Sequence, residues 1–209
     1  MKNALLGAAS ALFLMTGAAL AAPADQPGHQ NPAPGSANET VSAVKDTTYG
    51  LVGQISASMT TTTRGFINAA AISDMYEVTA GKIALQRSTS PAVKEFAQKM
   101  VDAHTTTTDR LKSIIADKDI AVTPPAHVDT LHEGLLDDLR AAKSGDFDHR
   151  YISQQIAAHK AADMLFRGYA KDGDLGALKK FAAATDPDIK MHLDMADKLD
   201  IDVKSASSK

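Results

Sequence analysis

Long stretches without proline constrain this chain more than any other feature of its sequence. From residue 46 onward the only prolines are Pro91, Pro124, Pro125 and Pro187. The stretches between them are rich in Ala, Lys, Leu, Asp and Gln, and their apolar residues recur at helical spacing. None has the sustained alternation of apolar and polar residues that is typical of β-strands. The sequence therefore predicts an all-α fold.

The periodic pattern predicts four long helices, one short helix and one helix that precedes them. Ser90 suits the N-cap of the second long helix, and Pro91 its first turn, where a missing N–H costs nothing. We expect the long helices over residues 63–87, 91–117, 146–172 and 174–200, the short one over 129–142, and the preceding one over 41–59.

The lengths of the connections predict the topology of the bundle. The first two long helices and the last two are joined by short links, so each pair forms an antiparallel hairpin. Residues 118–145 form a connection long enough to travel the ~38 Å length of a 25-residue helix. We therefore expect a ferritin-like four-helix bundle, up-down-down-up with one long crossover. A plain up-and-down bundle is the alternative.

The N-terminal region is typical of an exported protein. Lys2 precedes an apolar stretch over residues 4–20, and Ala19 and Ala21 offer the small residues that signal peptidase requires. We expect a signal peptide over residues 1–21 and a disordered spacer, rich in Pro, Gly, Asn and Ser, over 22–45. A helical domain over 46–204 then remains, without a transmembrane segment after cleavage. These features predict a periplasmic protein.

Composition excludes several classes of function. The chain has no cysteine, which excludes disulfide scaffolds, zinc fingers and thiol catalysis. A pI near 6.1 and a net charge of -3 disfavour nucleic-acid binding. No glycine-rich phosphate loop and no serine nucleophile motif occurs. None of the glutamates is followed by histidine three residues later, so the usual di-iron carboxylate site is excluded as well.

Each long helix carries one titratable residue on its apolar face. These residues are Glu77, His104, His159 and His192. The first three lie near the midpoints of their helices and are expected at one height, whereas His192 lies about 7 Å further along its axis. Imidazoles gathered with a carboxylate inside a bundle suit Zn²⁺, Cu²⁺ or Fe²⁺. The four residues are therefore candidate metal ligands.

Further polar residues lie on or beside the same faces: Tyr76, Tyr151, Gln155, Asp163 and Asp188. The two aspartates lie four residues from a histidine of the set and are expected to orient its ring. The tyrosines and the glutamine offer another interpretation, a hydrogen-bonded network without metal. Residues 105–108, a run of threonines beside His104, are expected to bond their hydroxyls to the backbone.

Several of these stretches resemble a known family, the domain-of-unknown-function 4142 family. The similarity covers about residues 66–199 and is most specific over residues 90–104. It is carried by Phe66–Ile67, Glu77, Gly81–Leu85, Ser90–His104, Phe147–Tyr151, His159 and His192–Ala196. The resemblance implies a ferritin-like bundle exported by bacteria, and it implies no particular activity.

Two functional hypotheses follow from the sequence. The first is a non-enzymatic bundle that acts through an unidentified protein partner or in an envelope stress response, since no complete catalytic set is present. The second is a mononuclear metal-binding protein that uses Glu77, His104, His159 and His192. A redox or peroxide enzyme with a single metal ion would require the second hypothesis to hold first.

Overall fold

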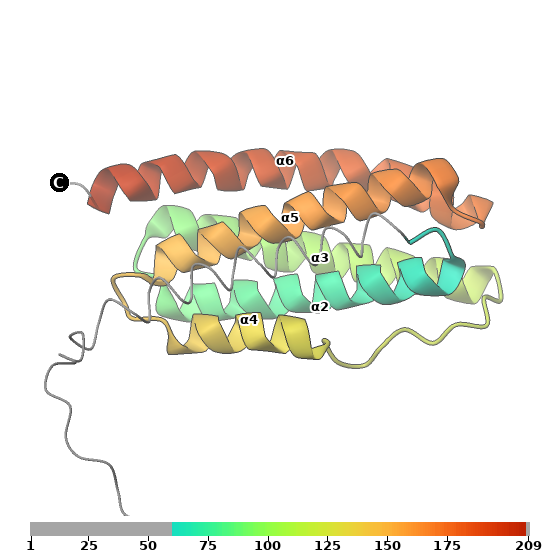
Figure 1. Ribbon diagram of the computed structural model, residues 1–209, viewed down its shortest axis with the longest axis horizontal. Coiled ribbons are helices and arrows are strands. Elements are labelled where there is room, and N and C mark those ends of the chain that lie inside the picture. The colour runs from blue at the N-terminus through green and yellow to red at the C-terminus, as the bar shows by residue number, and fades with distance from the viewer. Residues whose placement is uncertain (1–59, 208–209) are drawn as a thin grey trace, which may run out of the picture. The chain divides into compact units, whose positions relative to one another are not determined.

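The computed structural model describes residues 60–207, with side chains to Ile201, and these residues contain five helices and no strand. In chain order they are α2 (Thr63–Arg87), α3 (Pro91–Asp117), α4 (Thr130–Ala141), α5 (Phe147–Asp172) and α6 (Gly176–Ser207) (Figure 1). The all-α prediction is confirmed. The expected signal peptide over 1–21, spacer over 22–45 and helix over 41–59 lie outside the described residues.

Side-chain caps explain where α3 and α4 begin. Ser90 caps α3 by accepting a hydrogen bond from the backbone N–H of Val93 at 3.4 Å. Asp129 caps α4 through the N–H of His132 at 2.9 Å. The α6 helix differs from the expectation, because it begins at Gly176 and continues past residue 200 to Ser207. No glycine or proline interrupts the chain after Pro187, so nothing stops this helix at residue 200.

The four long helices follow the predicted up-down-down-up path. In Figure 1, α2 and α6 run in one direction, and α3 and α5 in the other. Phe66 near the start of α2 stacks on Tyr169 near the end of α5, with ring centroids 4.2 Å apart, so these two helices are antiparallel. A plain up-and-down bundle would make them parallel. The connection from α3 to α5 includes α4, which packs on α2 and α5.

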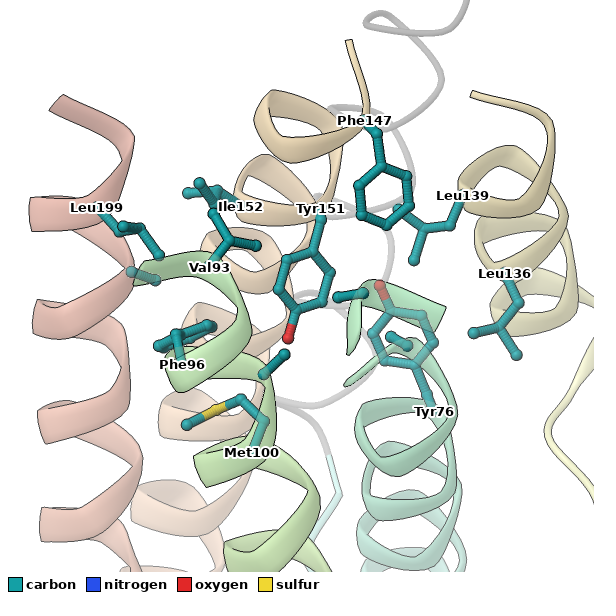
Figure 2. Close-up of a cluster of buried hydrophobic side chains, with 14 residues drawn as sticks. Tyr76, Val93, Phe96, Met100, Leu136, Leu139, Phe147, Tyr151, Ile152 and Leu199 are labelled. Atoms are coloured by element: carbon teal, nitrogen blue, oxygen red, sulfur yellow. The ribbon is translucent and has the colours of Figure 1, made fainter. Parts of the chain in front are cut away.

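The apolar core consists of two clusters at opposite ends of the bundle. The first joins the end of α2, the start of α3 and the start of α5, with Leu136 and Leu139 of α4 packed against it (Figure 2). The second joins the start of α2 to the end of α5 and the first half of α6. On every long helix the residues between the two clusters include buried polar side chains. A polar layer therefore crosses the middle of the core.

Two local features bring the helices close together. The guanidinium of Arg87, at the end of α2, donates to carbonyl oxygens in the last turn of α4 and lies 4.8 Å from the centre of the Phe147 ring. Gly81 allows α2 to approach α3 closely. A Cβ atom at this position would lie 3.0 Å from the carbonyl oxygen of Ala97 and 2.8 Å from a methyl group of Val101.

The surface of the described residues is mostly polar. Met191 and Ile201 are the large apolar side chains that it exposes, at 43% and 64%. Within residues 60–207 no helix combines the length and the apolar character needed to cross a membrane.

Candidate metal centre

Three imidazoles meet in the polar layer at the middle of the bundle. His104 comes from α3, His159 from α5 and His192 from α6, and each is less than a tenth exposed. Their ring centroids are 5.5 to 5.9 Å apart. One ring nitrogen from each histidine lies within 4.8 Å of the other two. The structure thus brings together all three histidines that the sequence singled out.

Two of these rings are held on the side away from the others. The Nδ1 atom of His104 lies 2.8 Å from a carboxylate oxygen of Asp74, and Nδ1 of His159 donates to the backbone carbonyl of Gln155 at 2.8 Å. The Nε2 atoms of both rings, and Nδ1 of His192, are buried and have no hydrogen-bond partner among the described residues. Histidines that bind a metal usually donate their other ring N–H to a carboxylate or a backbone carbonyl. His104 and His159 are arranged in this way.

Asp74 is a buried residue beside the histidines that the sequence analysis missed. Its side chain on α2 is 3% exposed, and its second oxygen accepts a hydrogen bond from the Thr108 hydroxyl at 3.1 Å. The other three threonines of the run bond backbone carbonyls of their own helix, as expected. The sequence did contain a feature that could have identified Asp74: it lies three positions before Glu77, a spacing that places both carboxylates on one helix face.

Glu77 lies beside the imidazoles but outside the group of potential ligand atoms. One of its oxygens is 3.9 Å from Nδ1 of His159, the nitrogen that bonds Gln155, and its other oxygen has no hydrogen-bond partner among the described residues. The side chain is 1% exposed. Burial raises the pKa of Glu77 to about 7, although the charge of His104 and the nearby Gln155 amide act in the opposite direction. The structure therefore does not place Glu77 with the three histidines as a fourth ligand.

The aromatic residues predicted near the site have different surroundings. The Tyr76 hydroxyl donates to Gln154 at 2.9 Å, and its ring packs edge-on against His132, so Tyr76 faces α4 rather than the imidazoles. Tyr151 is fully buried in the first apolar cluster, and its hydroxyl has no hydrogen-bond partner among the described residues. Burial together with the charge of Glu77 raises the pKa of Tyr151 well above the usual value.

The two aspartates expected to orient histidines do not bond them. Asp163 lies 3.4 Å from Arg167 and 3.5 Å from Lys190, so its carboxylate pairs with cations and not with His159. Asp188 is exposed and acts on His192 only through its charge, which favours the protonated ring. The backbone carbonyl of Gln155 accepts the hydrogen bond from His159, while its side chain interacts with Glu77 and lowers the pKa of that carboxyl group.

The three rings differ in their protonation. Burial and then the charge of His104 lower the pKa of His159 to about 3 and that of His192 to about 4. Burial also disfavours the charged form of His104, but its hydrogen bond to Asp74 and the charges of Glu77 and Asp74 outweigh this, so its pKa is raised. At neutral pH two of the imidazoles are thus neutral, the form in which histidine binds metal ions.

A cavity of about 480 Å³ reaches the histidines from the surface. Its inner wall includes His104, His192 and Asp74, and its rim includes the exposed side chains of Lys99 and Arg110. The buried side chains of Phe166 and Ile189 form an apolar wall. Two of the three imidazoles therefore border a space large enough for a small molecule.

Fold and site together define an all-α bundle protein whose helices enclose a buried cluster of histidines. The sequence model of the family described as a domain of unknown function (DUF4142) matches residues 52–199, and the chain belongs to this family. The match confirms the resemblance found in the sequence and extends it toward the N-terminus. No curated protein and no solved structure matches the chain. The family is uncharacterised, so a function has to be inferred from the site.

Proposed function

We propose that this chain is an exported, periplasmic bundle protein that binds one divalent transition-metal ion through His104, His159 and His192. Two observations carry the proposal: each of the three histidines has one buried ring nitrogen without a partner among the described residues, and one ring nitrogen from each histidine lies within 4.8 Å of the other two. A buried polar atom left without a partner costs about 1–3 kcal/mol. One metal ion would satisfy all three atoms at once.

The interpretation as a closed hydrogen-bond network fits the site less well. Such a network would pair the ring nitrogens with the neighbouring polar groups. Within the described residues the Gln155 side chain interacts with Glu77, but one Glu77 oxygen and the Tyr151 hydroxyl keep no hydrogen-bond partner, and neither group bonds the free ring nitrogens. The unpartnered ring nitrogens are thus what supports the proposal of a metal ion.

The chemistry of the donors favours Zn²⁺, Cu²⁺ or Fe²⁺. Imidazole nitrogen is a common ligand of all three ions, and none of the donors is a thiolate. Nitrogens bound tetrahedrally at about 2.0–2.1 Å lie roughly 3.4 Å apart. The separations of up to 4.8 Å mean that an ion would draw the rings together by about an ångström.

Metal binding is the activity that the buried histidines support. The part of the proposal that concerns export rests on the first 21 residues, which resemble a signal peptide.

The proposal is tested by titrating the metal-free full chain with Zn²⁺, Cu²⁺ and Fe²⁺ in a calorimeter and by elemental analysis. We expect one ion per chain. At an ion concentration about 100 times Kd, binding should stabilise the fold by about 2.7 kcal/mol, visible as a higher Tm.

A matched pair of variants on α5 shows whether the predicted histidines hold the ion. His159→Gln should abolish stoichiometric binding, whereas His149→Gln, which changes an exposed histidine of the same helix, should leave it intact. His192→Asn provides a second loss-of-ligand variant if His159→Gln fails to fold. The proposal is wrong if the wild type binds no ion, or if folded ligand variants bind as tightly as His149→Gln.

A further inference from the structure

The cavity beside the histidines contains features that point to a second binding partner, and the argument rests on the proposed metal centre. We propose that the metal-loaded protein binds a small monocarboxylate with an apolar body in this cavity. The carboxylate would complete the coordination of the ion, and the apolar body would lie against Phe166 and Ile189.

The first step is that the protein supplies three ligands where a tetrahedral ion takes four. Among the described residues, the group of potential ligand atoms comprises only the three histidines. Asp74 is the nearest carboxylate on the cavity wall, and its two oxygens bond His104 and Thr108. Sites with three protein ligands keep the fourth position for water or for an exogenous molecule.

The second step is that this exogenous ligand has a route to the ion. His104 and His192 both line the cavity, which continues outward to exposed residues of α3 and α6. Its volume of about 480 Å³ lies within the range of small-molecule sites. A ligand bound to the ion would therefore extend into the cavity and toward its rim.

The third step is the balance of charge along the cavity wall. Two cationic residues, Lys99 and Arg110, line the cavity and form no ion pair within the described residues. Three carboxylates also line the cavity, those of Asp74, Asp102 and Asp188. Counting only the residues that line the cavity, a divalent ion with neutral histidines gives one net positive charge. Without the ion the same residues carry no excess of positive charge. The charge thus matches a single anionic group, and only when metal is bound.

The apolar wall distinguishes a carboxylate that carries an apolar body from an inorganic anion. Phe166 and Ile189 are each 3% exposed and present hydrocarbon to the cavity. Inorganic anions are strongly hydrated and gain nothing from such a wall, whereas an alkyl chain gains by leaving water. A short-chain fatty acid has both the charge and the apolar surface that this cavity would accommodate.

The test uses the full chain loaded with Co²⁺, whose visible absorption reports its ligands, and sodium butyrate as the probe. We expect butyrate to change the Co²⁺ spectrum with saturation and n-butylamine, its cationic counterpart, to leave it unchanged. Calorimetry should detect no butyrate binding to the metal-free chain. Sodium chloride at equal ionic strength controls for screening.

Variants of the rim test whether the ligand lies in this cavity. The double variant Lys99→Gln, Arg110→Gln, measured at saturating Co²⁺, should weaken butyrate binding by about five- to ten-fold. A matched double variant at exposed lysines outside the cavity lining, Lys82→Gln with Lys180→Gln, should bind butyrate like the wild type.

The outcomes separate this inference from the proposed function. A chain that binds no Co²⁺ overturns both proposals. A chain that binds one Co²⁺, with a spectrum that butyrate does not alter, overturns only the carboxylate site. Equal butyrate affinity in the two double variants, or equal responses to butyrate and butylamine, would also overturn it.

Discussion

The hydrogen bond between Asp74 and His104 offers a sharp test of the proposed metal centre. We expect Asp74→Asn to weaken Zn²⁺ binding at pH 8 by about 10- to 100-fold, which is the usual cost of removing a group that orients a ligating imidazole. The Nδ1–Oδ1 distance is 2.8 Å and both side chains are buried, so solvent cannot replace the lost charge. This loss corresponds to about 1.4–2.7 kcal/mol of binding free energy.

The same substitution should change how metal binding depends on pH. Asp74 raises the pKa of His104, so in the wild type a proton competes with the metal ion at this ring as the pH falls through that raised value. In the variant the ring loses its proton at a lower pH, and the competition is weaker. The difference in affinity between wild type and variant should therefore narrow from pH 8 to pH 6.

The loss of Zn²⁺ affinity and its dependence on pH are both measured by letting the full chain compete with a chelating dye for Zn²⁺. Asp163→Asn is the control, because Asp163 pairs with Arg167 and Lys190 and bonds none of the three rings. It should change Zn²⁺ affinity by less than about two-fold, as expected of an independent site. Equal losses of Zn²⁺ affinity in Asp163→Asn and Asp74→Asn, or unchanged Zn²⁺ affinity in Asp74→Asn, would refute the role assigned to Asp74.

Two further predictions concern the stability of the metal-free chain, measured by urea unfolding. Burial raises the pKa of Glu77 from 4.5 to about 7, so the carboxyl group's contribution to stability is fully present below about 4.5 and is lost as the pH rises through about 7. Glu77→Gln should thus raise the free energy of unfolding by up to roughly 3 kcal/mol at pH 8.5 and change it little at pH 4.5. An effect of the same size at both pH values would contradict this prediction. Gly81→Ala should destabilise the bundle by about 1–3 kcal/mol, because the added Cβ atom would collide with Ala97 and Val101. Gly168→Ala is the control: its Cβ atom meets open space, and it should stabilise the bundle by about 0.5–1 kcal/mol. Stabilisation by both substitutions would refute the close packing of α2 on α3.

The sequence predicted the helices well because their ends carry local signals. Ser90 and Pro91 start α3, and Asp172 and Gly173 stop α5, and each signal acts through the backbone nearby. The end of α6 has no such signal, and the helix was expected to end at residue 200. This error also misplaced His192, which lies near the midpoint of the helix that extends from Gly176 to Ser207.

The site was predictable only in part, because packing decides which side chains touch. Helical spacing placed the three histidines on inward faces, and the structure brings them together. The same spacing cannot decide between Asp74 and Glu77, which lie three residues apart on one face of α2. The rotation of α2 against α3 makes Asp74 the residue that bonds His104, and leaves Glu77 beside His159.

The position of the histidines between two apolar clusters has a consequence for how the chain assembles. Shifting one long helix along its axis by a single turn, ~5.4 Å, would push an imidazole among residues such as Met100 or Leu111 and bring hydrocarbon against the remaining rings. The buried imidazoles thus favour one axial register of the helices, and they do so in the metal-free protein.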